Sequence, residues 1–311
     1  MTRQPNFPRR RPFVWRLALA GGLMAGAAQA QTQGCIELEH RFDSSVTEAS
    51  APQMSSFLFS SADSGCANVA AKALAAGASL EARDRQGGTP LTHAARAGRA
   101  NLVALMLDNG AAIDQRDING STPLLAAIEK NRADVVQVLV GRGADVSVQG
   151  RSGVSTVAAA AWLGDADMVA LLLDRGADGL AADATGKPPI LYAAARASVP
   201  VVTRLLQLGI DVNAHYAGDQ TVLMWTAGHP ADAPATQALQ LAGLLLDKGA
   251  RIDEADDRGR TALMNAAELD HAAMVDLLLA RGAKAEARDK QGKTAAEITA
   301  NVEIRAKLTA R

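Results

Sequence analysis

Apolar and polar positions follow one another along most of the chain in a pattern that returns every 33 residues. In a typical unit, a short helix is predicted from Thr89 to about Gly98, because Thr89 can cap its first turn and Pro90 fits there without a backbone N–H. A second helix, predicted from Asn101 to Asn109, has an apolar face of Leu, Val and Met that is too wide for an isolated helix. Each helix pair must therefore stack on its neighbours.

Two markers keep this register. One is a Thr-Pro-Leu triplet or a relaxed version of it, which places unit starts near residues 56, 89, 122, 155, 188, 221, 261 and 294. The other is a glycine that can adopt the left-handed backbone that ends a helix, at Gly77, Gly110, Gly143, Gly176, Gly209, Gly249 and Gly282. Two independent markers in phase predict a repeat architecture.

The motif T-P-L-x-x-A-A…G-A-D stands almost unchanged in Thr89–Asp114 and Thr122–Asp145, and it resembles the hallmark of the ankyrin-repeat family. The resemblance covers about residues 56–311, or about seven units with atypical first and last copies. It implies an all-α solenoid whose inner helices line a concave groove and whose turn-rich segments project as β-hairpin fingers. Gly150 and Tyr216 replace the usual finger Asp, and the triplet at residues 155–157 lacks proline, so we expect these units to be less regular.

One unit breaks the spacing, because the step from Thr221 to Thr261 is 40 residues. The extra residues fall after Ala227, in the proline-containing stretch 229–237, and are expected to lengthen a loop at the edge of the groove. Loop growth costs little free energy. A tolerated insertion and a loop that contacts a partner are therefore both open.

Residues 1–30 have the three parts of a cleavable secretory signal: a basic start, an apolar stretch over Leu17–Ala28 and an A-x-A site that ends at Ala30. The apolar stretch is too short to cross a bilayer, so a permanent anchor is the weaker alternative. Arg10 and Arg11 also resemble a twin-arginine signal, and the general and twin-arginine routes stay open. The sequence predicts a periplasmic or secreted bacterial protein without a stable membrane anchor.

Composition narrows the class of protein further. Hydrophobic residues make up 48% of the chain but aromatic ones only 3%, which suits close packing of Ala-rich helices. The chain has 32 basic and 33 acidic side chains, and the leader holds five of the basic ones and no acid, so the processed protein would carry a net charge of about −6. An acidic protein of this kind argues against a nucleic-acid partner.

The two cysteines, Cys35 and Cys66, both lie near the mature N-terminus. In an oxidising compartment an even count favours a disulfide, and two separate thiols are the alternative. We expect the extension at residues 31–55 to fold over the first unit and cover its apolar surface, tied by this bridge.

No constellation for catalysis stands out, so we expect no enzyme, no cofactor and no metal site. No H-E-x-x-H motif occurs, and the histidines are scattered at His40, His93, His215, His229 and His271. Five carboxylates recur at one place in each unit, where Asp can bond its own backbone in a turn: Asp84, Asp117, Asp183, Asp256 and Asp289.

Binding is better supported by the aromatic residues of the inner helices and fingers. Trp162 occupies a helix-end position that, by the resemblance, faces the groove and varies between partners, so we expect it to contact a partner. Tyr192 and Trp225 share a less exposed position, where packing between units is the favoured role. The surface around Trp162 is expected to carry Lys130, Leu163, Arg196 and His229, and the fingers to form a second strip of Arg85, Arg116, Ile118, Arg151, Tyr216 and Arg258.

For the charged members of these sets, a solvated face of mixed charge explains the pattern equally well. The sequence as a whole predicts a monomeric scaffold or accessory factor that binds a protein partner through its groove and finger tips. Two alternatives are an inhibitor or immunity protein for a toxic enzyme, and a small-ligand or sugar-binding module that uses the aromatic groove.

Overall fold

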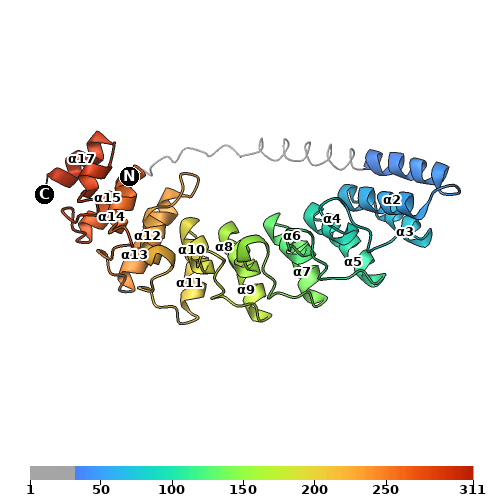
Figure 1. The fold of residues 1–311 in the computed structure, drawn as a ribbon, viewed down its shortest axis with the longest axis horizontal. Coiled ribbons are helices and arrows are strands. Elements are labelled where there is room, and N and C mark those ends of the chain that lie inside the picture. Colours follow the sequence, from blue (N-terminus) through green and yellow to red (C-terminus); the bar gives the residue numbers. More distant parts are fainter. Residues whose placement is uncertain (1–31, 311) are drawn as a thin grey trace, which may run out of the picture.

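The computed structural model describes residues 32–310, so the predicted leader lies outside the described residues. The described chain forms an arc of eight helix pairs, one more than the seven units expected, with one helix of each pair on the concave side (Figure 1). The pairs are α2 (Ala51–Ser64) and α3 (Ala67–Ala75), α4 (Pro90–Ala97) and α5 (Ala100–Asp108), α6 (Pro123–Glu129) and α7 (Ala133–Gly141), α8 (Thr156–Leu163) and α9 (Ala166–Asp174), α10 (Pro189–Ala195) and α11 (Val199–Leu206), α12 (Val222–Ala227) and α13 (Ala235–Asp247), α14 (Ala262–Glu268) and α15 (Ala272–Ala280), and α16 (Ala295–Ile298) and α17 (Val302–Thr309).

Local sequence explains where these helices begin and end. Thr89 accepts a hydrogen bond from the Thr92 backbone N–H, and the equivalent side chains cap α6, α8, α12 and α14 in the same way. The seven periodic glycines all have positive φ, as at Gly110, where φ is +90°. A side chain at such a position would strain the backbone, so glycine ends the first seven outer helices at low cost.

The core is continuous but built only from neighbours. Each of the paired helices packs on its own partner, and most also pack on the equivalent helices of the adjacent pairs. Leucines such as Leu102, Leu139 and Leu172 on the outer helices are fully buried between units. The predicted reason for stacking is therefore confirmed: the apolar faces of the outer helices are covered by neighbouring pairs.

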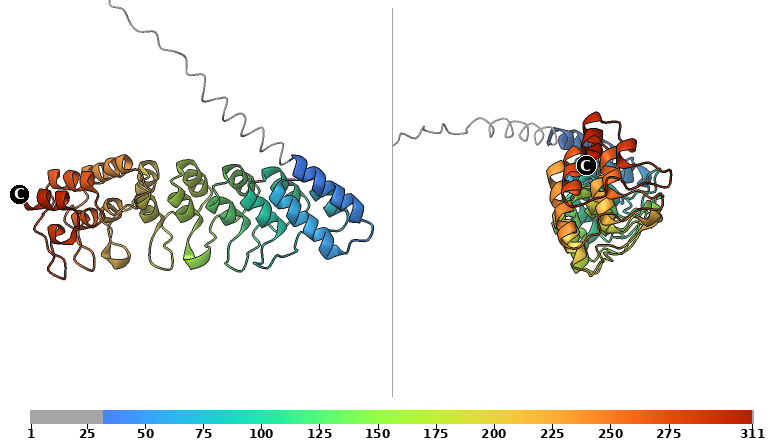
Figure 2. Two further views of the ribbon diagram at one scale, coloured as in Figure 1. Left: turned by 90° about the horizontal axis from the view of Figure 1, so that it is seen from above. Right: turned by 90° about the vertical axis from the view of Figure 1, so that its left-hand side faces the viewer.

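The fingers project to one side of the helix rows (Figure 2). In the regular fingers the Asp side chain accepts two backbone N–H bonds, as Asp117 does from Asn119 and Ser121, which confirms the turn role expected for these carboxylates. The expected β-hairpins are not formed as strands: within residues 32–310 only two isolated bridges occur, Gln149–Ser155 and Tyr216–Gln220. Each finger is too short to form more than one or two cross-bonds.

The two fingers without Asp are the irregular ones, as expected. There the chain forms the short 3-10 helices η1 (Arg151–Gly153) and η2 (Ala217–Asp219). Ser152 and Asp219, which are not glycine, have positive φ at these turns. The loss of the Asp that organises the turn explains the change.

The insertion differs from its expected form. The inter-helix loop is longer than elsewhere, but the outer helix α13 also grows to 13 residues, whereas α5, α7, α9 and α15 have nine. The extra residues are therefore divided between the loop at residues 228–234 and the first turn of α13.

The N-terminal extension covers the first pair. A helix over residues 32–45 buries Leu38 and Phe42, and the Phe42 ring meets Phe57 of α2 edge-on at 5.3 Å. Cys35 and Cys66 are joined by a disulfide. Because α2 begins at Ala51, the unit start placed near residue 56 falls inside a helix.

At the other end, α17 buries Ile304 and Leu308 against the array and leaves its charged residues exposed. Lys307 forms an ion pair with Asp276 of α15, 2.7 Å apart. The last pair thus presents a polar outer surface to solvent.

Candidate functional site

Trp162 lies near the C-terminal end of α8, in the inner row of helices, and 45% of its surface is exposed. Two side chains hold it there. The Tyr192 ring of α10 meets the indole edge-on at 6.4 Å, and the Arg196 guanidinium lies 5.2 Å from the centre of a Trp162 ring. A cation at that distance is attracted by the negative face of the ring. The side chain is therefore both exposed and fixed in orientation.

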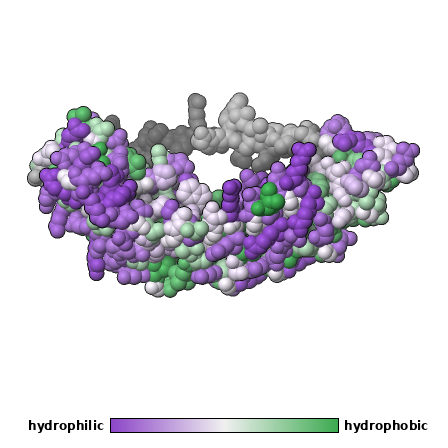
Figure 3. All heavy atoms as spheres, in the orientation of Figure 1, coloured by the Kyte–Doolittle hydropathy of each residue, from purple (hydrophilic) through white to green (hydrophobic). Residues whose placement is uncertain are grey.

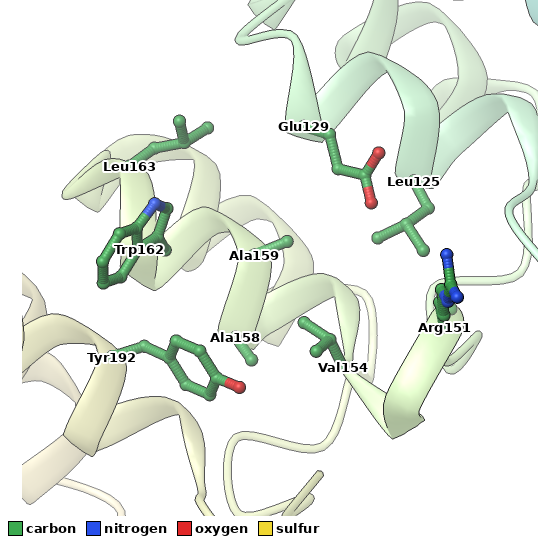
Figure 4. A pocket seen from close by; sticks show the side chains of 10 residues that line it. Leu125, Glu129, Arg151, Val154, Ala158, Ala159, Trp162, Leu163 and Tyr192 are labelled. Atoms are coloured by element: carbon green, nitrogen blue, oxygen red, sulfur yellow. The ribbon is translucent and has the colours of Figure 1, made fainter. Parts of the chain in front are cut away.

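An apolar pocket of about 330 Å³ opens beside Trp162 (Figure 4). Its floor is formed by α6, the start of α8 and the turn before it, with Leu125, Val154, Ala158 and Ala159. Gly150 also belongs to the wall. A Cβ at this glycine would overlap Leu125 Cδ2, so the absence of a side chain lets the finger approach the floor.

Two unpaired charges flank the floor. Glu129 points from the end of α6 toward the space above Leu125, and Arg151 of η1 stands on the other side of Leu125 (Figure 4). Neither side chain forms a hydrogen bond or an ion pair with another described residue. Loss of solvent at the pocket raises the pKa of Glu129, although Lys130 and Arg96 nearby act in the opposite direction. The pocket therefore has an apolar centre with opposite charges at its two sides.

The insertion reaches this site through an ion pair. Asp232, in the loop at residues 228–234, lies 2.7 Å from Arg196, and this pairing lowers the pKa of Asp232. Arg196 in turn lies over Trp162. Sequence reasoning missed Asp232, whose only signal was its place in the insertion.

Tyr192 is held by the finger of its own unit. Its hydroxyl donates to Asp183 Oδ2 at 2.5 Å, and His93 Nε2 meets Asp84 Oδ2 at 2.8 Å at the equivalent place. Burial acts to raise the pKa of Asp183, but its hydrogen bonds, led by that from Tyr192, outweigh this and lower it to about 2. Burial and the same carboxylate raise the pKa of Tyr192. Tyr192 thus links its helix to the finger by a hydrogen bond and also lines the pocket.

Comparison with known families adds to this geometry. A family model for ankyrin repeats (3 copies) matches residues 58–150 and 231–301, which together make up just over half of the chain. The chain belongs to the ankyrin-repeat family. No curated protein matches it.

Elsewhere in the ankyrin array, Trp225 is half-buried and has the Lys187 ammonium 5.1 Å from its ring. Its indole N–H is buried without a hydrogen-bond partner. In this unit Tyr216 stands where other fingers have Asp, so the acceptor that Tyr192 uses is missing. Trp225 therefore packs between units and does not join the Trp162 pocket.

His229 was expected on the surface near Trp162, and the structure contradicts this. Only 4% of His229 is exposed, and its ring meets that of His271 edge-on at 3.9 Å. The His271 Nδ1–H donates to the Ala227 carbonyl. Burial, with a smaller contribution from His271, lowers the pKa of His229.

The finger strip is only partly available for binding. Arg116 donates to the carbonyls of Gly120 and Gln149, and Arg258 pairs with Asp256 at 2.9 Å, so both guanidinium groups stabilise the fingers. Tyr216 is half-buried. The strip members that stay exposed without a side-chain partner are Arg85, Ile118 and Arg151, and of these Arg151 alone lines the Trp162 pocket.

The remaining members of the Trp162 set lie in part where they were expected: Lys130 is exposed beside Glu129, and Leu163 lines the pocket.

Seen from the side of Figure 1, the surface is largely hydrophilic with small, separate hydrophobic areas (Figure 3). Within residues 32–310 no cluster of three possible metal ligands occurs. None of the described helices has the length and apolarity needed to cross a bilayer.

Proposed function

We propose that this ankyrin-repeat protein is an exported interaction scaffold or accessory factor that binds a protein partner at the Trp162 site. Ankyrin repeats generally mediate contacts between proteins, and nothing in the described chain indicates catalysis. The proposal includes a bacterial, periplasmic or secreted location, which the leader-like residues 1–30 support together with the Cys35–Cys66 disulfide.

The observation that carries the binding role is the exposure of Trp162 next to an apolar pocket. Aromatic residues seated in pockets dominate interface energies, and truncation of a central one costs about 2–4 kcal/mol of binding. Trp162 is also held in place before any partner arrives, by Tyr192 and Arg196. Less conformational entropy is therefore lost on docking.

A photo-crosslinking amino acid in place of Trp162 tests the proposal in intact cells that make the full chain. The expected result is a discrete crosslinked species, identified by mass spectrometry. The same replacement at Glu286, an exposed residue at the far end of the array, is the control. Identical products at both positions would overturn the assignment of the site.

A second experiment uses the identified partner. Trp162→Ala should weaken its binding at least thirtyfold while the midpoint of thermal unfolding changes little, because the side chain is 45% exposed. Unchanged affinity in the folded variant would refute the site. Inhibition of an enzymatic partner by stoichiometric protein would favour the inhibitor over the scaffold.

A further inference from the structure

We infer that the Trp162 pocket receives an internal, extended segment of a protein chain in which one large apolar side chain lies between a basic residue and an acidic residue. The inference rests on the proposed function and adds the chemistry of the partner. The segment bound in the pocket would place its apolar side chain on Leu125 and Val154, its basic residue at Glu129 and its acidic residue at Arg151.

The size of the pocket supports a single side chain as anchor. About 330 Å³ lies at the small end of the range for ligand sites, and the lining offers mostly carbon: Leu125, Val154, Ala158, Ala159 and Leu163, with the rings of Trp162 and Tyr192. A leucine or phenylalanine would lose solvent on several sides there. An isolated polar group would lose hydrogen bonds to water without replacement.

Charge complementarity sets the flanks. Most charged side chains near the pocket already have partners: Arg196 is paired with Asp232, and Asp183 accepts from Tyr192. Glu129 and Arg151 do not, and both line the same pocket. Glu129 is exposed at the edge of the pocket, and although Lys130 and Arg96 lie nearby, neither forms an ion pair with it, so a cation of the partner can approach its carboxylate directly. Complementary charges of this kind determine which partner is accepted and in which register.

The orientation is fixed by the scaffold. Glu129 ends α6 in the inner row and Arg151 belongs to η1 at the finger, so a segment that meets both must run between the inner helices and the finger tips. The direction of the segment along that line is not specified by two charges. Probes must therefore be made in both orders.

The test uses nine-residue peptides with acetylated and amidated ends and a central leucine. Five peptides differ only in the two residues beside the leucine. Two mixed peptides carry one Lys and one Asp, in the two possible orders. The other three carry two Lys, two Asp or two Ser. Binding is followed by the emission of Trp162 in the processed Trp225→Phe protein, where it is the one tryptophan left. One of the two mixed peptides is expected to bind about fivefold more tightly than the serine peptide, and more tightly than either peptide of uniform charge.

Charge reversal makes the test specific. Glu129→Lys should shift the preference to the peptide with two Asp, and Arg151→Glu to the peptide with two Lys. Arg85→Glu is a matched control, because Arg85 is an exposed arginine at the same register position two units earlier. Glu286→Lys is the control for Glu129→Lys.

Each outcome decides the inference. Reversed preferences in both variants, with unchanged preferences in both controls, support it. Peptide binding that quenches Trp162 but ignores flank charge overturns the inference while the proposed function stands. Equal binding by free leucine, or no response to any peptide at millimolar concentration, also overturns it, and free leucine would point to a small-ligand site. Failure of the crosslinking at residue 162 would instead remove the proposed function itself.

Discussion

Removal of the Cys35–Cys66 disulfide should release the N-terminal helix from the array. The helix over residues 32–45 contacts the first pair through few groups: Leu38 and Phe42 are buried, and Lys72 pairs with Glu39 and Asp43. The ion pairs are exposed and contribute little. The covalent link is therefore expected to supply most of the free energy that keeps the helix docked.

The magnitude follows from the length of chain that the bridge closes. The two cysteines are 31 residues apart. In the chain-entropy description a loop of that length restricts the unfolded ensemble by about 4 kcal/mol at 25 °C. Because repeat arrays unfold locally from their ends, the effect should concentrate in the extension and the first pair.

Trypsin provides the assay, since Arg41 is an exposed cleavage site inside this helix. Oxidised protein, protein reduced with dithiothreitol and the Cys35→Ser/Cys66→Ala variant are compared under native conditions. Reduction and substitution should each accelerate cleavage after Arg41, by up to about a thousandfold, because the opening free energy falls by about 4 kcal/mol. Cleavage in the central units should change little.

Equal cleavage rates for the oxidised and reduced proteins would refute this reasoning, because they would show that packing alone holds the helix. Alkylation of both cysteines without reductant would refute the bridge itself. An acceleration in the variant but not in the reduced protein would point to the replaced side chains. Cys66 is buried, so its substitution could perturb packing directly.

Three further predictions use urea unfolding. Burial lowers the pKa of His229 in the fold below its usual 6.5, so the fold favours the neutral ring. This contribution to stability is fully present above pH 6.5 and is lost as the pH falls toward the folded pKa. The free energy of unfolding of the wild type should therefore fall over that pH interval, and this pH dependence should disappear in His229→Gln. Tyr192→Phe should reduce the free energy of unfolding at pH 7 by about 1–2 kcal/mol, and the deficit should shrink as the pH falls through about 2, where Asp183 becomes protonated in the fold; a deficit that stays constant would contradict the role of the carboxylate. Gly150→Ala should destabilise by about 1–2 kcal/mol through the buried leucine beneath it, while Gly141→Ala, in a helix with nothing near its added Cβ, should stabilise by about 0.5–1 kcal/mol, and equal effects would reject the close approach.

Much of the fold could be predicted from sequence because it depends on local chemistry that recurs. A threonine at a helix start, a glycine at a helix end and an Asp in a finger each act within a few residues, and their 33-residue register carries the stacking with it. Gly150 and Tyr216 mark the irregular fingers for the same reason. The exact division of the insertion between loop and helix did not follow, because no side chain caps the start of α13 and marks that position in the sequence.

The site was harder to predict, since its parts come from three units and an insertion. Trp162 could be singled out by its register position, but its pocket depends on Leu125 from one unit and Tyr192 from another. His229 was expected at the surface on the same reasoning and is buried, whereas Arg116 is exposed but its guanidinium donates to carbonyls of the fingers. A register position says which way a backbone faces, but not which neighbouring atom a long side chain will meet.

The Trp162 pocket belongs to the fourth of eight helix pairs, so several units separate it from either terminus. Within residues 32–310 the main helix contacts lie within a pair or between adjacent pairs. Shortened versions of the protein that lack the outermost pairs should therefore still recognise the same ligand, and such a minimal fragment would be a convenient sensor or crystallisation target. In this architecture, the stability of the whole chain and the ability of its central surface to bind a ligand are separable properties.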